Sequence, residues 1–389
     1  MFILEAPYVS DALAEAAATL GLPVLDTPAA RAALASRGVT LLGDAEFAEA
    51  YRSTPGARLY ANSENAIGWV AEHLADTGLP AAIEAFKDKY AFRRMLEDLH
   101  PEVGFAGCTL AELREFDPTS IAAPFVVKPA VGFFSMGVHV VEDPAQWAEV
   151  VARIQHEAGA LARIYPDAVL GLDRFVIEQV IEGDEYAVDA YFDSDGEPVI
   201  VNVLGHLFAS ASDVSDRVYI TDTELVGRWR EPFAEYLREV GRRADLRDFP
   251  VHAELRVDSV GRIAPIEVNP MRFAGWCVTD IARHAYGIDP YRAYLLDEAP
   301  DWAAISSECA GTVTAAVIAD LPSTLDRSTI ASVDYEAFST NFSDLRELRR
   351  VDYVTYPVFA FAFVQVPAGE LGELQAMLGA DMTRYLQLG

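Results

Sequence analysis

The sequence predicts a protein of mixed α/β and α+β class: a small N-terminal parallel α/β domain, a central region of antiparallel sheets, and a C-terminal α+β extension. Three observations support this class. Up to about residue 85, short apolar strands alternate with helices, which is typical of a parallel sheet. From residue 86, strands follow one another around short turns, which is typical of antiparallel pairing. After residue 300, long apolar strands and a closing helix continue the second pattern.

The N-terminal part begins with an apolar strand and continues through helices and short strands. We expect strands at 1–6, 23–26, 38–43 and 58–62, and helices at 10–22 and 64–75. Asn62 or Ser63 precedes the second helix and is of a type that caps helices. Glu64 and Asn65 open the same helix, and we interpret them as capping residues at a domain edge.

The central and C-terminal parts consist mainly of longer strands. A helix is expected near 88–99, another from Pro144, a third near 231–244, and the last at 369–379. The expected strands are 124–128, 137–142, 174–181, 185–193, 197–205, a hairpin over 251–269, 311–321 and 352–366.

Composition excludes several classes of protein. The net charge of −30 argues against general binding to nucleic acid or to anionic membranes, since both require a basic surface. No apolar run reaches the roughly 18 residues of a membrane span. The N-terminus lacks the basic start of a signal peptide, and three scattered cysteines do not suggest a disulfide framework. A cytoplasmic location is therefore expected.

The hairpin at 251–269 places acids on one face. A tight turn centred between Val260 and Gly261 would put Glu254 directly opposite Glu267, and His252 opposite Asn269. Opposed carboxylates repel each other, so a positive group is expected between them. Two carboxylates and an amide oxygen are also suitable ligands for Mg²⁺. The face is either such a site or a solvated surface of a very acidic chain.

Two further segments have the composition of ligand-binding loops. Lys128 ends a strand and precedes a loop with Gly132 and Gly137, whose backbone N–H groups could hold phosphate oxygens. The stretch 178–185, "EQVIEGDE", joins two strands and could offer backbone groups to a nucleobase. Each segment could equally be an ordinary hairpin. Only three of the 30 basic residues are lysines, so a lysine here is of interest.

Taken in order, these segments resemble the ATP-grasp superfamily. The resemblance covers about residues 86–290, and the N-terminal unit is similar to the small domain that precedes the grasp. The residues that carry it are Lys89 in "DKYAFRRML", Lys128 in "FVVKPAVGFFSMGV", "IEQVIEGDEYAV", Glu254 in "HAEL", and Glu267, Asn269 and Arg272 in "IEVNPMR". Phe133 and Phe134 depart from the small residues usual in the phosphate loop.

The resemblance implies a role for each matching residue. Lys89 and Lys128 would contact the phosphates of ATP, and Arg272, with Lys128, would act on the transferring phosphoryl group. Glu254, Glu267 and Asn269 would hold two Mg²⁺ ions, for which Mn²⁺ could substitute. The ATP-binding set implied as a whole is Lys89, Lys128, Ser135, Met136, Glu178, Gln179, Val180, Ile181 and Glu185, the last of these on the ribose.

The reaction implied is that of an ATP-dependent carboxylate–amine ligase. An amide or peptide bond would form through an acyl phosphate, with release of ADP and phosphate. The alternatives are a grasp-fold kinase and a nucleotide-binding protein without turnover. Substrates would be a small carboxylate and an amine, near the loop that contains His206, Arg217 and Tyr219. A homodimer is compatible with this interpretation.

The resemblance also suggests domain boundaries. The expected units are an N-terminal domain at 1–85, a small ATP-grasp subdomain at 86–175, a large subdomain at 176–300 and an extension at 301–389.

Overall fold

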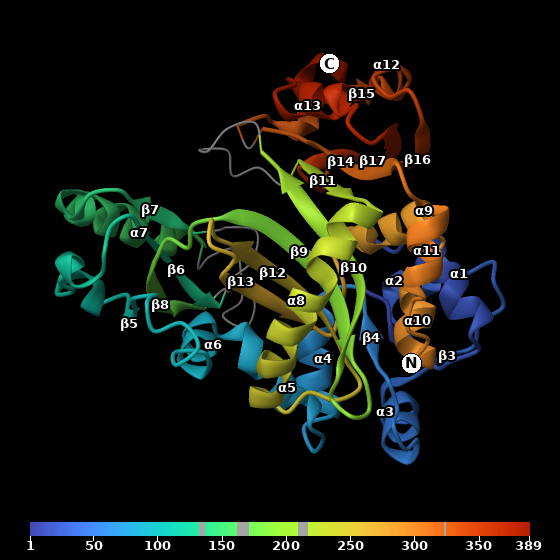
Figure 1. Cartoon of the computed structure of the whole chain (residues 1–389), viewed down its shortest axis with the longest axis horizontal. Coiled ribbons are helices and arrows are strands. Elements are labelled where there is room, and N and C mark those ends of the chain that lie inside the picture. Colours follow the sequence, from blue (N-terminus) through green and yellow to red (C-terminus); the bar gives the residue numbers. More distant parts are fainter. Residues whose placement is uncertain (132–136, 162–170, 209–216, 323) are drawn as a thin grey trace.

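The computed structural model describes residues 1–131, 137–161, 171–208, 217–322 and 324–389 (Figure 1). It has the predicted mixed α/β class, with a small parallel sheet at the N-terminus and larger antiparallel sheets after it. Among the described helices, none combines the length and the apolar composition needed to cross a bilayer.

The N-terminal domain is a four-stranded parallel sheet in the order β3-β2-β1-β4. Ser10 and Thr27 cap its first two helices by accepting hydrogen bonds from Leu13 N and Ala30 N. Helices α2 and α3 were not predicted from the sequence. With them, a helix lies in each connection between the strands of this sheet. The elements are β1 (Phe2–Ile3), α1 (Asp11–Thr19), β2 (Val24–Leu25), α2 (Pro28–Leu34), β3 (Leu41–Leu42), α3 (Asp44–Ser53), β4 (Tyr60–Ala61) and α4 (Ala66–His73).

A second, four-stranded antiparallel sheet has the order β5-β8-β6-β7 and is covered by a long helix, α7. Its core is formed by Phe125, Val127, Phe175 and Ile177, which pack against Trp147 of α7. Two short helices, α5 and α6, lead into it. The elements are α5 (Leu79–Lys87), α6 (Lys89–Met95), β5 (Phe105–Thr109), β6 (Phe125–Val131), β7 (His139–Val141), α7 (Trp147–Leu161) and β8 (Gly171–Gln179).

The chain changes sheet between β8 and the next strand, β9 (Asp184–Phe192), so the two do not form the simple surface hairpin considered from the sequence. Gly183 makes this crossing with φ of 128°, a conformation that favours glycine. A Cβ atom there would overlap the backbone carbonyl of Val257 on β12. A glycine at this position therefore allows the crossing strand to pass against the hairpin.

The largest sheet has eight strands in the order β13-β12-β9-β10-β11-β14-β17-β16. The long helix α8 (Thr223–Arg243) lies across β9 and β10 (Figure 1) and packs on the apolar face with Phe233 and Leu237. The other strands are β10 (Pro198–Leu207), β11 (Val218–Thr221), β12 (Phe249–Val257), β13 (Ile263–Pro270), β14 (Thr312–Asp320), β16 (Leu345–Arg350) and β17 (Val358–Pro367).

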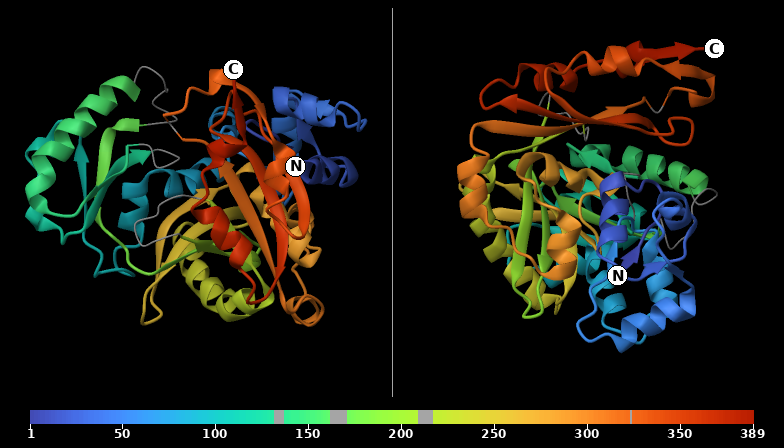
Figure 2. Two further views of the ribbon diagram at one scale, coloured as in Figure 1. Left: turned by 90° about the horizontal axis from the view of Figure 1, so that it is seen from above. Right: turned by 90° about the vertical axis from the view of Figure 1, so that its right-hand side faces the viewer.

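The strands after residue 300 continue this same sheet, because β14 pairs directly with β11. Figure 2 shows the C-terminal strands stacked above the rest of the chain. A small sheet and short helices complete this part. Its remaining elements are α11 (Trp302–Glu308), β15 (Ile330–Val333), α12 (Tyr335–Ser339), α13 (Gly372–Leu378) and β18 (Leu386–Leu388).

The register of the β12–β13 hairpin confirms the predicted pairs, Glu254 with Glu267 and His252 with Asn269. The predicted turn was wrong, however: Val257 pairs with Ile263, so the loop is longer than a tight even-numbered turn. A register shift just after Glu254 compensates for this difference. Near the turn, Ile263 lies opposite Val257 and packs against the core.

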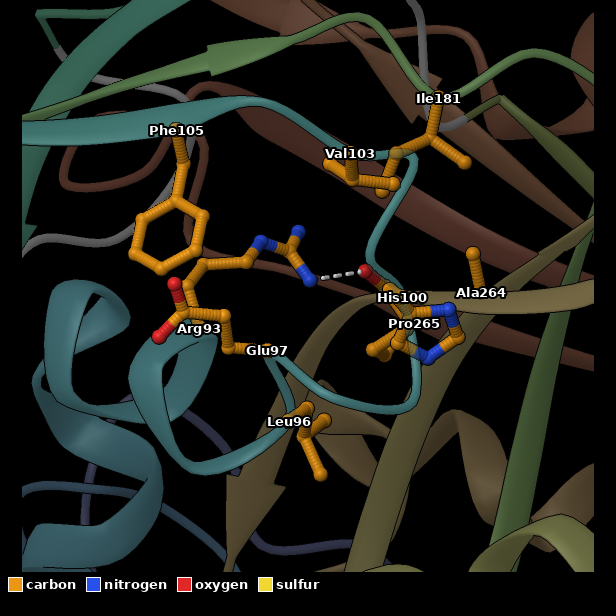
Figure 3. A pocket seen from close by; sticks show the side chains of 9 residues that line it. All are labelled: Arg93, Leu96, Glu97, His100, Val103, Phe105, Ile181, Ala264 and Pro265. Carbon is orange, nitrogen blue, oxygen red and sulfur yellow. Dashed lines mark hydrogen bonds between the residues drawn. The ribbon is translucent and has the colours of Figure 1, made fainter.

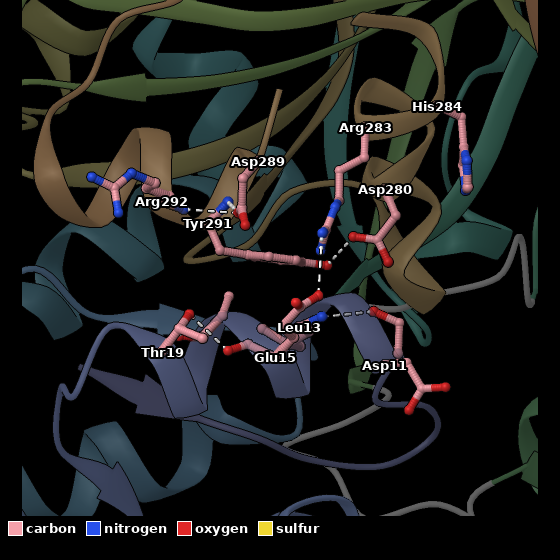
Figure 4. A network of polar contacts seen from close by, with 12 residues as sticks. Asp11, Leu13, Glu15, Thr19, Asp280, Arg283, His284, Asp289, Tyr291 and Arg292 are labelled. Carbon is pink, nitrogen blue, oxygen red and sulfur yellow. Dashed lines mark hydrogen bonds and ion pairs between the residues drawn. The ribbon is translucent and has the colours of Figure 1, made fainter. Parts of the chain in front are cut away.

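An exposed ion pair ties the N-terminal part to the centre, and buried polar contacts tie the C-terminal strands to it. Arg283 of α9 (Ile281–Tyr286) pairs with Glu15 of α1 at 3.3 Å, and Tyr291 of α10 (Pro290–Leu296) donates to Asp280 at 2.7 Å (Figure 4). Arg349 of β16 reaches the other oxygen of Asp280 at 2.7 Å. Arg349 and Asp280 are almost completely buried, so each depends on the other for compensation.

We predict that Arg349→Met destabilises the protein by about 3–5 kcal/mol, because it leaves Asp280 buried without its counter-charge. The control is Arg346→Ala on the same strand, whose side chain is half exposed and contacts Asp344 at 3.5 Å. It should change the free energy of unfolding by less than about 1 kcal/mol. Urea denaturation of both variants tests this, and equal midpoints would contradict it.

Candidate active site

The acidic face of the β12–β13 hairpin is compensated by an amide and an ammonium group. Nδ2 of Asn269 lies between the two carboxylates, 3.4 Å from Glu254 Oε1 and 3.3 Å from Glu267 Oε1. Nζ of Lys89, at the start of α6, lies 3.3 Å from Glu267 Oε2. A positive group, one of the predicted nucleotide lysines, is therefore present beside Glu267, whereas the group between the two carboxylates is the amide of Asn269 and not the expected cation.

The ionised form of Glu267 is favoured in this environment. Burial acts to raise the pKa of Glu267, but the ammonium groups of Lys89 and Lys128 act more strongly, and the net direction is downward. A group that stays ionised while buried can accept a cation without first losing a proton.

The hairpin face fits Mg²⁺ in its ligand chemistry. Magnesium sites usually take one or two carboxylates and complete their shell with water and phosphate oxygens, which matches Glu254 and Glu267. Asn269 would join them by turning its amide so that the oxygen faces the cation. Among the residues that the structure describes, no group of three or more His, Cys, Asp or Glu side chains is arranged to hold a metal alone.

A buried ion-paired cluster lies next to this face. Glu178 of β8 binds Lys128 Nζ of β6 at 2.6 Å and also pairs with the guanidinium of Arg93 from α6. Arg93 also donates to the carbonyl of Pro265 at 2.6 Å (Figure 3). A second hydrogen bond from Arg93 reaches the carbonyl of Ile266 at 3.1 Å. One arginine thus connects the helix of Lys89, the strand of Glu178 and the strand of the acidic hairpin.

The cluster also shifts the ionisation of its members. Burial acts to raise the pKa of Glu178, but Arg93 and Lys128 outweigh it and lower this pKa to about 2. Burial lowers the pKa of Lys128, an effect that Glu178 opposes. The carboxylate of Glu178 is therefore ion-paired with two side chains, Arg93 and Lys128. Within the predicted hinge, this carboxylate holds Lys128 in place.

Several backbone groups of the predicted hinge make contacts within the protein: Gln179 N donates to Gly104 O at 2.9 Å. Val180 N donates to Pro124 O at 3.0 Å, and Ile181 O accepts from Arg256 Nη1 at 2.6 Å. A nucleobase would have to use other peptide groups of the stretch. The cavity beside Ile181 in Figure 3 has a volume of about 10 Å³, the space of about one water molecule, so it does not itself hold a base.

Glu185 lies on β9 with the residues predicted around the ribose and substrate. It pairs with Arg256 Nη2 at 2.9 Å and lies 3.4 Å from His206 Nδ1. The ring of His206 stacks on Tyr219, with 4.5 Å between ring centroids. The structure thus brings Glu185, His206 and Tyr219 together.

Arg217 serves a different purpose. Its guanidinium pairs with Asp320 at 2.8 Å and donates to the carbonyls of Met377, Leu378 and Ala380 at the end of α13. Because helix ends leave such carbonyls without partners, this arginine closes α13 against the large sheet. The contact of Arg217 with substrate stays a prediction, and it would require the guanidinium to leave or share these partners.

Arg272, at the end of the acidic hairpin, binds a residue of the N-terminal domain. Glu64 Oε1 lies 3.0 Å from Arg272 Nη2, and Glu64 Oε2 lies 2.5 Å from Lys87 Nζ. Arg272 and Lys87 lower the pKa of Glu64 to about 2 against the effect of burial. The capping interpretation holds for Asn65 only in position: Asn65 is the N-cap residue of α4, but its side chain makes no capping hydrogen bond and its amide donates to Ala6 O. The Glu64 carboxylate binds Arg272 and Lys87 instead of the helix end.

Comparison with known proteins places this arrangement in a family. The family model described as "ATP-grasp domain" matches residues 121–280, which include the buried lysine, the hinge and the acidic hairpin. The chain contains an ATP-grasp domain. This confirms the resemblance predicted from the sequence. No curated protein sequence matches the chain.

Solved structures with the same fold extend over the whole chain. An L-amino acid ligase from Bacillus licheniformis has 20% identity and a TM-score of 0.67, covering 100% of this chain and 98% of its own. An N5-carboxyaminoimidazole ribonucleotide synthetase from Thermotoga maritima has 15% identity and a TM-score of 0.63, with coverages of 100% and 98%. Biotin carboxylase from Campylobacter jejuni has 13% identity and a TM-score of 0.64, with coverages of 100% and 92%.

Several residues of the ATP-grasp site were missed by sequence reasoning. Arg93 and Arg256 appeared to be ordinary charged residues, because their partners lie on strands whose pairing the sequence did not reveal. Lys87 was noted only as a rare lysine. Ser135 and Met136, predicted to contact ATP, lie outside the described residues, as do Phe133 and Phe134 of the phosphate loop.

We predict that Lys128→Ala weakens ATP binding more than tenfold while the fold is retained. A charge-assisted contact to phosphate is worth about 1.5–3 kcal/mol, and Glu178 keeps Arg93 as a partner in the variant. Calorimetric titration with a non-hydrolysable ATP analogue measures the loss. Arg94→Ala, on the exposed side of α6, is the control and should bind normally; wild-type affinity in Lys128→Ala would remove Lys128 from the site.

Proposed function

We propose that the protein is an ATP-dependent carboxylate–amine ligase that forms an amide or peptide bond. The observation that carries this proposal is the pair of opposed carboxylates, Glu254 and Glu267, with Asn269 between them and Lys89 alongside, in a chain with an ATP-grasp domain. A merely structural hairpin would have no need of two facing acids that require such compensation.

In this proposal, the nucleotide lies between the two antiparallel sheets. Lys89 and Lys128 are on the side of the small sheet, while Glu185 and the acidic hairpin belong to the large one. In the structure, the ammonium groups of Lys89 and Lys128 lie against carboxylates, those of Glu267 and Glu178. A polyphosphate that binds there would share the ammonium groups with these carboxylates or replace the carboxylates as counter-ions. The backbone of 178–181 would meet the base, and Glu185 the ribose.

Glu254, Glu267 and Asn269 would hold two Mg²⁺ ions together with phosphate oxygens. When bound, these ions would neutralise charge on the phosphates and polarise the transferred phosphoryl group. The residues of the chain provide position: the hairpin register fixes the spacing of the two carboxylates, and Lys89 adds a fixed positive charge at Glu267.

The reaction would proceed in two balanced steps. A substrate carboxylate oxygen attacks the γ-phosphorus, the bond to the bridging oxygen breaks, and ADP leaves. An amine nitrogen then attacks the acyl carbon, phosphate leaves with the bonding electron pair, and the nitrogen loses a proton. Arg272 would stabilise the charge on the acyl phosphate, for which it must give up or share its contact with Glu64.

The proposed domain roles follow the boundaries expected from the sequence. Residues 1–85 would contribute Glu64 to the substrate side of the site. ATP would be enclosed by residues 86–175 and 176–300. Residues 301–389 would support β11, the strand of Tyr219, through its pairing with β14. The solved L-amino acid ligase with this fold supports amino acids as the first substrates to examine.

We predict that the purified protein, given ATP and Mg²⁺, releases ADP and phosphate only when a carboxylate and an amine substrate are both present. Amino acids should be supplied singly and in pairs, and products identified by mass spectrometry. The control omits the amine. AMP and pyrophosphate would contradict the mechanism, and a stable phosphorylated acid formed without amine would indicate a kinase.

We also predict that Glu267→Gln abolishes turnover and largely preserves ATP binding. The amide keeps the shape but loses the charge that balances the metal ions, while Lys128 and the hinge are unchanged. In EDTA the variant should not be more stable than wild type, because it loses the ion pair between Glu267 Oε2 and Lys89 Nζ, which lie 3.3 Å apart.

Glu49→Gln, an exposed position on α3, is the matched control for this variant and should retain full turnover. Wild-type turnover in Glu267→Gln, together with a clearly lower melting temperature in EDTA, would make Glu267 a structural residue. Turnover and melting in EDTA, measured on both variants, thus distinguish a metal-binding role of Glu267 from a structural one.

A further inference from the structure

An arginine of the acidic hairpin lies on the nucleoside side of the proposed site. Arg256 follows Glu254 by two residues on β12, so the two side chains share one face of the strand. Arg256 lies directly opposite Glu185 of β9 and, on its other side, Ala264 of β13. One strand therefore carries a proposed metal ligand and, in the next row, the partner of the proposed ribose acceptor.

Arg256 holds two groups of the predicted nucleotide set at once. Its Nη2 and Nε donate to Glu185 Oε2, at 2.9 and 3.2 Å. Its Nη1 donates to the backbone carbonyl of Ile181 at 2.6 Å. A guanidinium is planar, stays protonated and presents its N–H groups in a fixed fork. The carboxylate and the carbonyl are therefore fixed relative to each other by one side chain.

The segment that Arg256 holds runs between two sheets. β8 ends at Gln179 and β9 begins at Asp184, so residues 180–183 lie outside both strands. The carbonyl of Ile181 is thus bound by a side chain rather than by a strand ladder. Gly183 of the same segment passes against the backbone of Val257, the residue after Arg256. Two adjacent residues of β12 therefore support this crossing.

The contact with Arg256 also sets the direction of the Glu185 carboxylate. An ionised carboxylate only accepts hydrogen bonds, and its two oxygens have about four acceptor positions. Arg256 binds Oε2, whereas Oε1 is directed toward His206, 3.4 Å from its Nδ1. Oε1 thus keeps acceptor capacity on the side away from Arg256. A ribose offers two neighbouring hydroxyl groups as donors for such an oxygen.

Stability alone does not account for this arginine. Its side chain is 29% exposed, and ion pairs in contact with solvent add little to stability. A cross-strand pair would also be complete with Glu185 as its only partner. The further hydrogen bond goes to a carbonyl of the predicted hinge, which indicates a role in the nucleotide site.

We propose that Arg256 is a positioning residue for the nucleoside part of ATP. Through Glu185 it orients the acceptor of the ribose hydroxyls, and through the Ile181 carbonyl it fixes the crossing that meets the base. This inference rests on the proposed function, because it needs a nucleotide at the crossing. β12 then sets the spacing between the two ends of the nucleotide, since Glu254 of the same strand belongs to the proposed metal site.

The ribose hydroxyls provide a readout that a purely structural role would not change. The ligands are ADP and dideoxy-ADP, which lacks both hydroxyls, and each is titrated by calorimetry in the presence of Mg²⁺. The ratio of the two dissociation constants is the readout, and melting of each ligand-free variant is recorded. Because hydrogen bonds to a charged acceptor are strong, the wild type should bind ADP about 10–100-fold more tightly than dideoxy-ADP.

We expect Arg256→Met to bind ADP about tenfold more weakly or worse and to reduce the ratio to about threefold or less. Glu185→Ala should lose the same preference, and the double variant should lose no more of it than either single variant. Arg262→Met is the matched control on the same hairpin. Its side chain is 66% exposed and pairs with Asp258 at 2.7 Å, so it should keep the wild-type ratio.

Wild-type affinity for both nucleotides in Arg256→Met, with the preference lost in Glu185→Ala, would overturn the inference and leave the proposed function intact. Weakening of both nucleotides by the same factor would also overturn it, because the arginine would then act on the phosphates or on the fold. A wild-type ratio in Glu185→Ala would reject the proposed ribose contact and the inference with it.

Absence of ADP binding in the wild type would reject the proposed function and the inference together. If Arg256→Met fails to fold, Arg256→Gln is measured instead. Its shorter amide does not reach both Glu185 and the Ile181 carbonyl, so the ratio should again fall. An unchanged ratio in Arg256→Gln would overturn the inference.

Discussion

The buried pairing of Glu178 with Arg93 and Lys128 is the interaction on which the rest of the site depends. Arg93 also binds the carbonyls of Pro265 and Ile266, so this single cluster fixes α6, β8 and β13 relative to one another. These elements carry Lys89, the hinge and Glu267. Removing Glu178 would leave two buried cations without their counter-charge, at a cost of about 3–5 kcal/mol, whereas removing Lys128 leaves Arg93 paired with Glu178. The alignment of the cationic and acidic sides of the site is therefore coupled to folding.

The chain is strongly acidic, yet its three lysines all lie in this region, each against a carboxylate. Lys87 pairs with Glu64, Lys89 with Glu267, and Lys128 with Glu178. In the structure, the ammonium groups proposed to bind phosphate are therefore paired with carboxylates of the protein itself. Binding a polyphosphate and divalent cations would exchange partners within the site: phosphates take the ammonium groups while cations take the carboxylates. Such an exchange conserves charge balance and links nucleotide binding to metal binding.

Local pattern was sufficient for part of this site. The alternation of polar and apolar residues predicted that Glu254 and Glu267 face each other, and the register confirms it. The predicted turn was wrong because a β-bulge and a longer loop offset each other in the strand register. The alternation of polar and apolar residues does not reveal such an inserted residue. The partners of Glu64 and Arg217 could not be predicted for another reason: Arg272 and Asp320 are more than 100 residues away along the chain, and a sequence pattern carries no information on such contacts.

The sequence by itself determined the fold class, the acidic hairpin face, and the order of lysines and acids that resembles the ATP-grasp superfamily. These features depend on side-chain periodicity and on residue type, which are local. Only the tertiary structure decided that Arg93 joins three elements, that Arg256 binds both Glu185 and Ile181, and that the C-terminal strands continue the large sheet. Each of these depends on which strands become neighbours, and that is decided by packing of the whole chain.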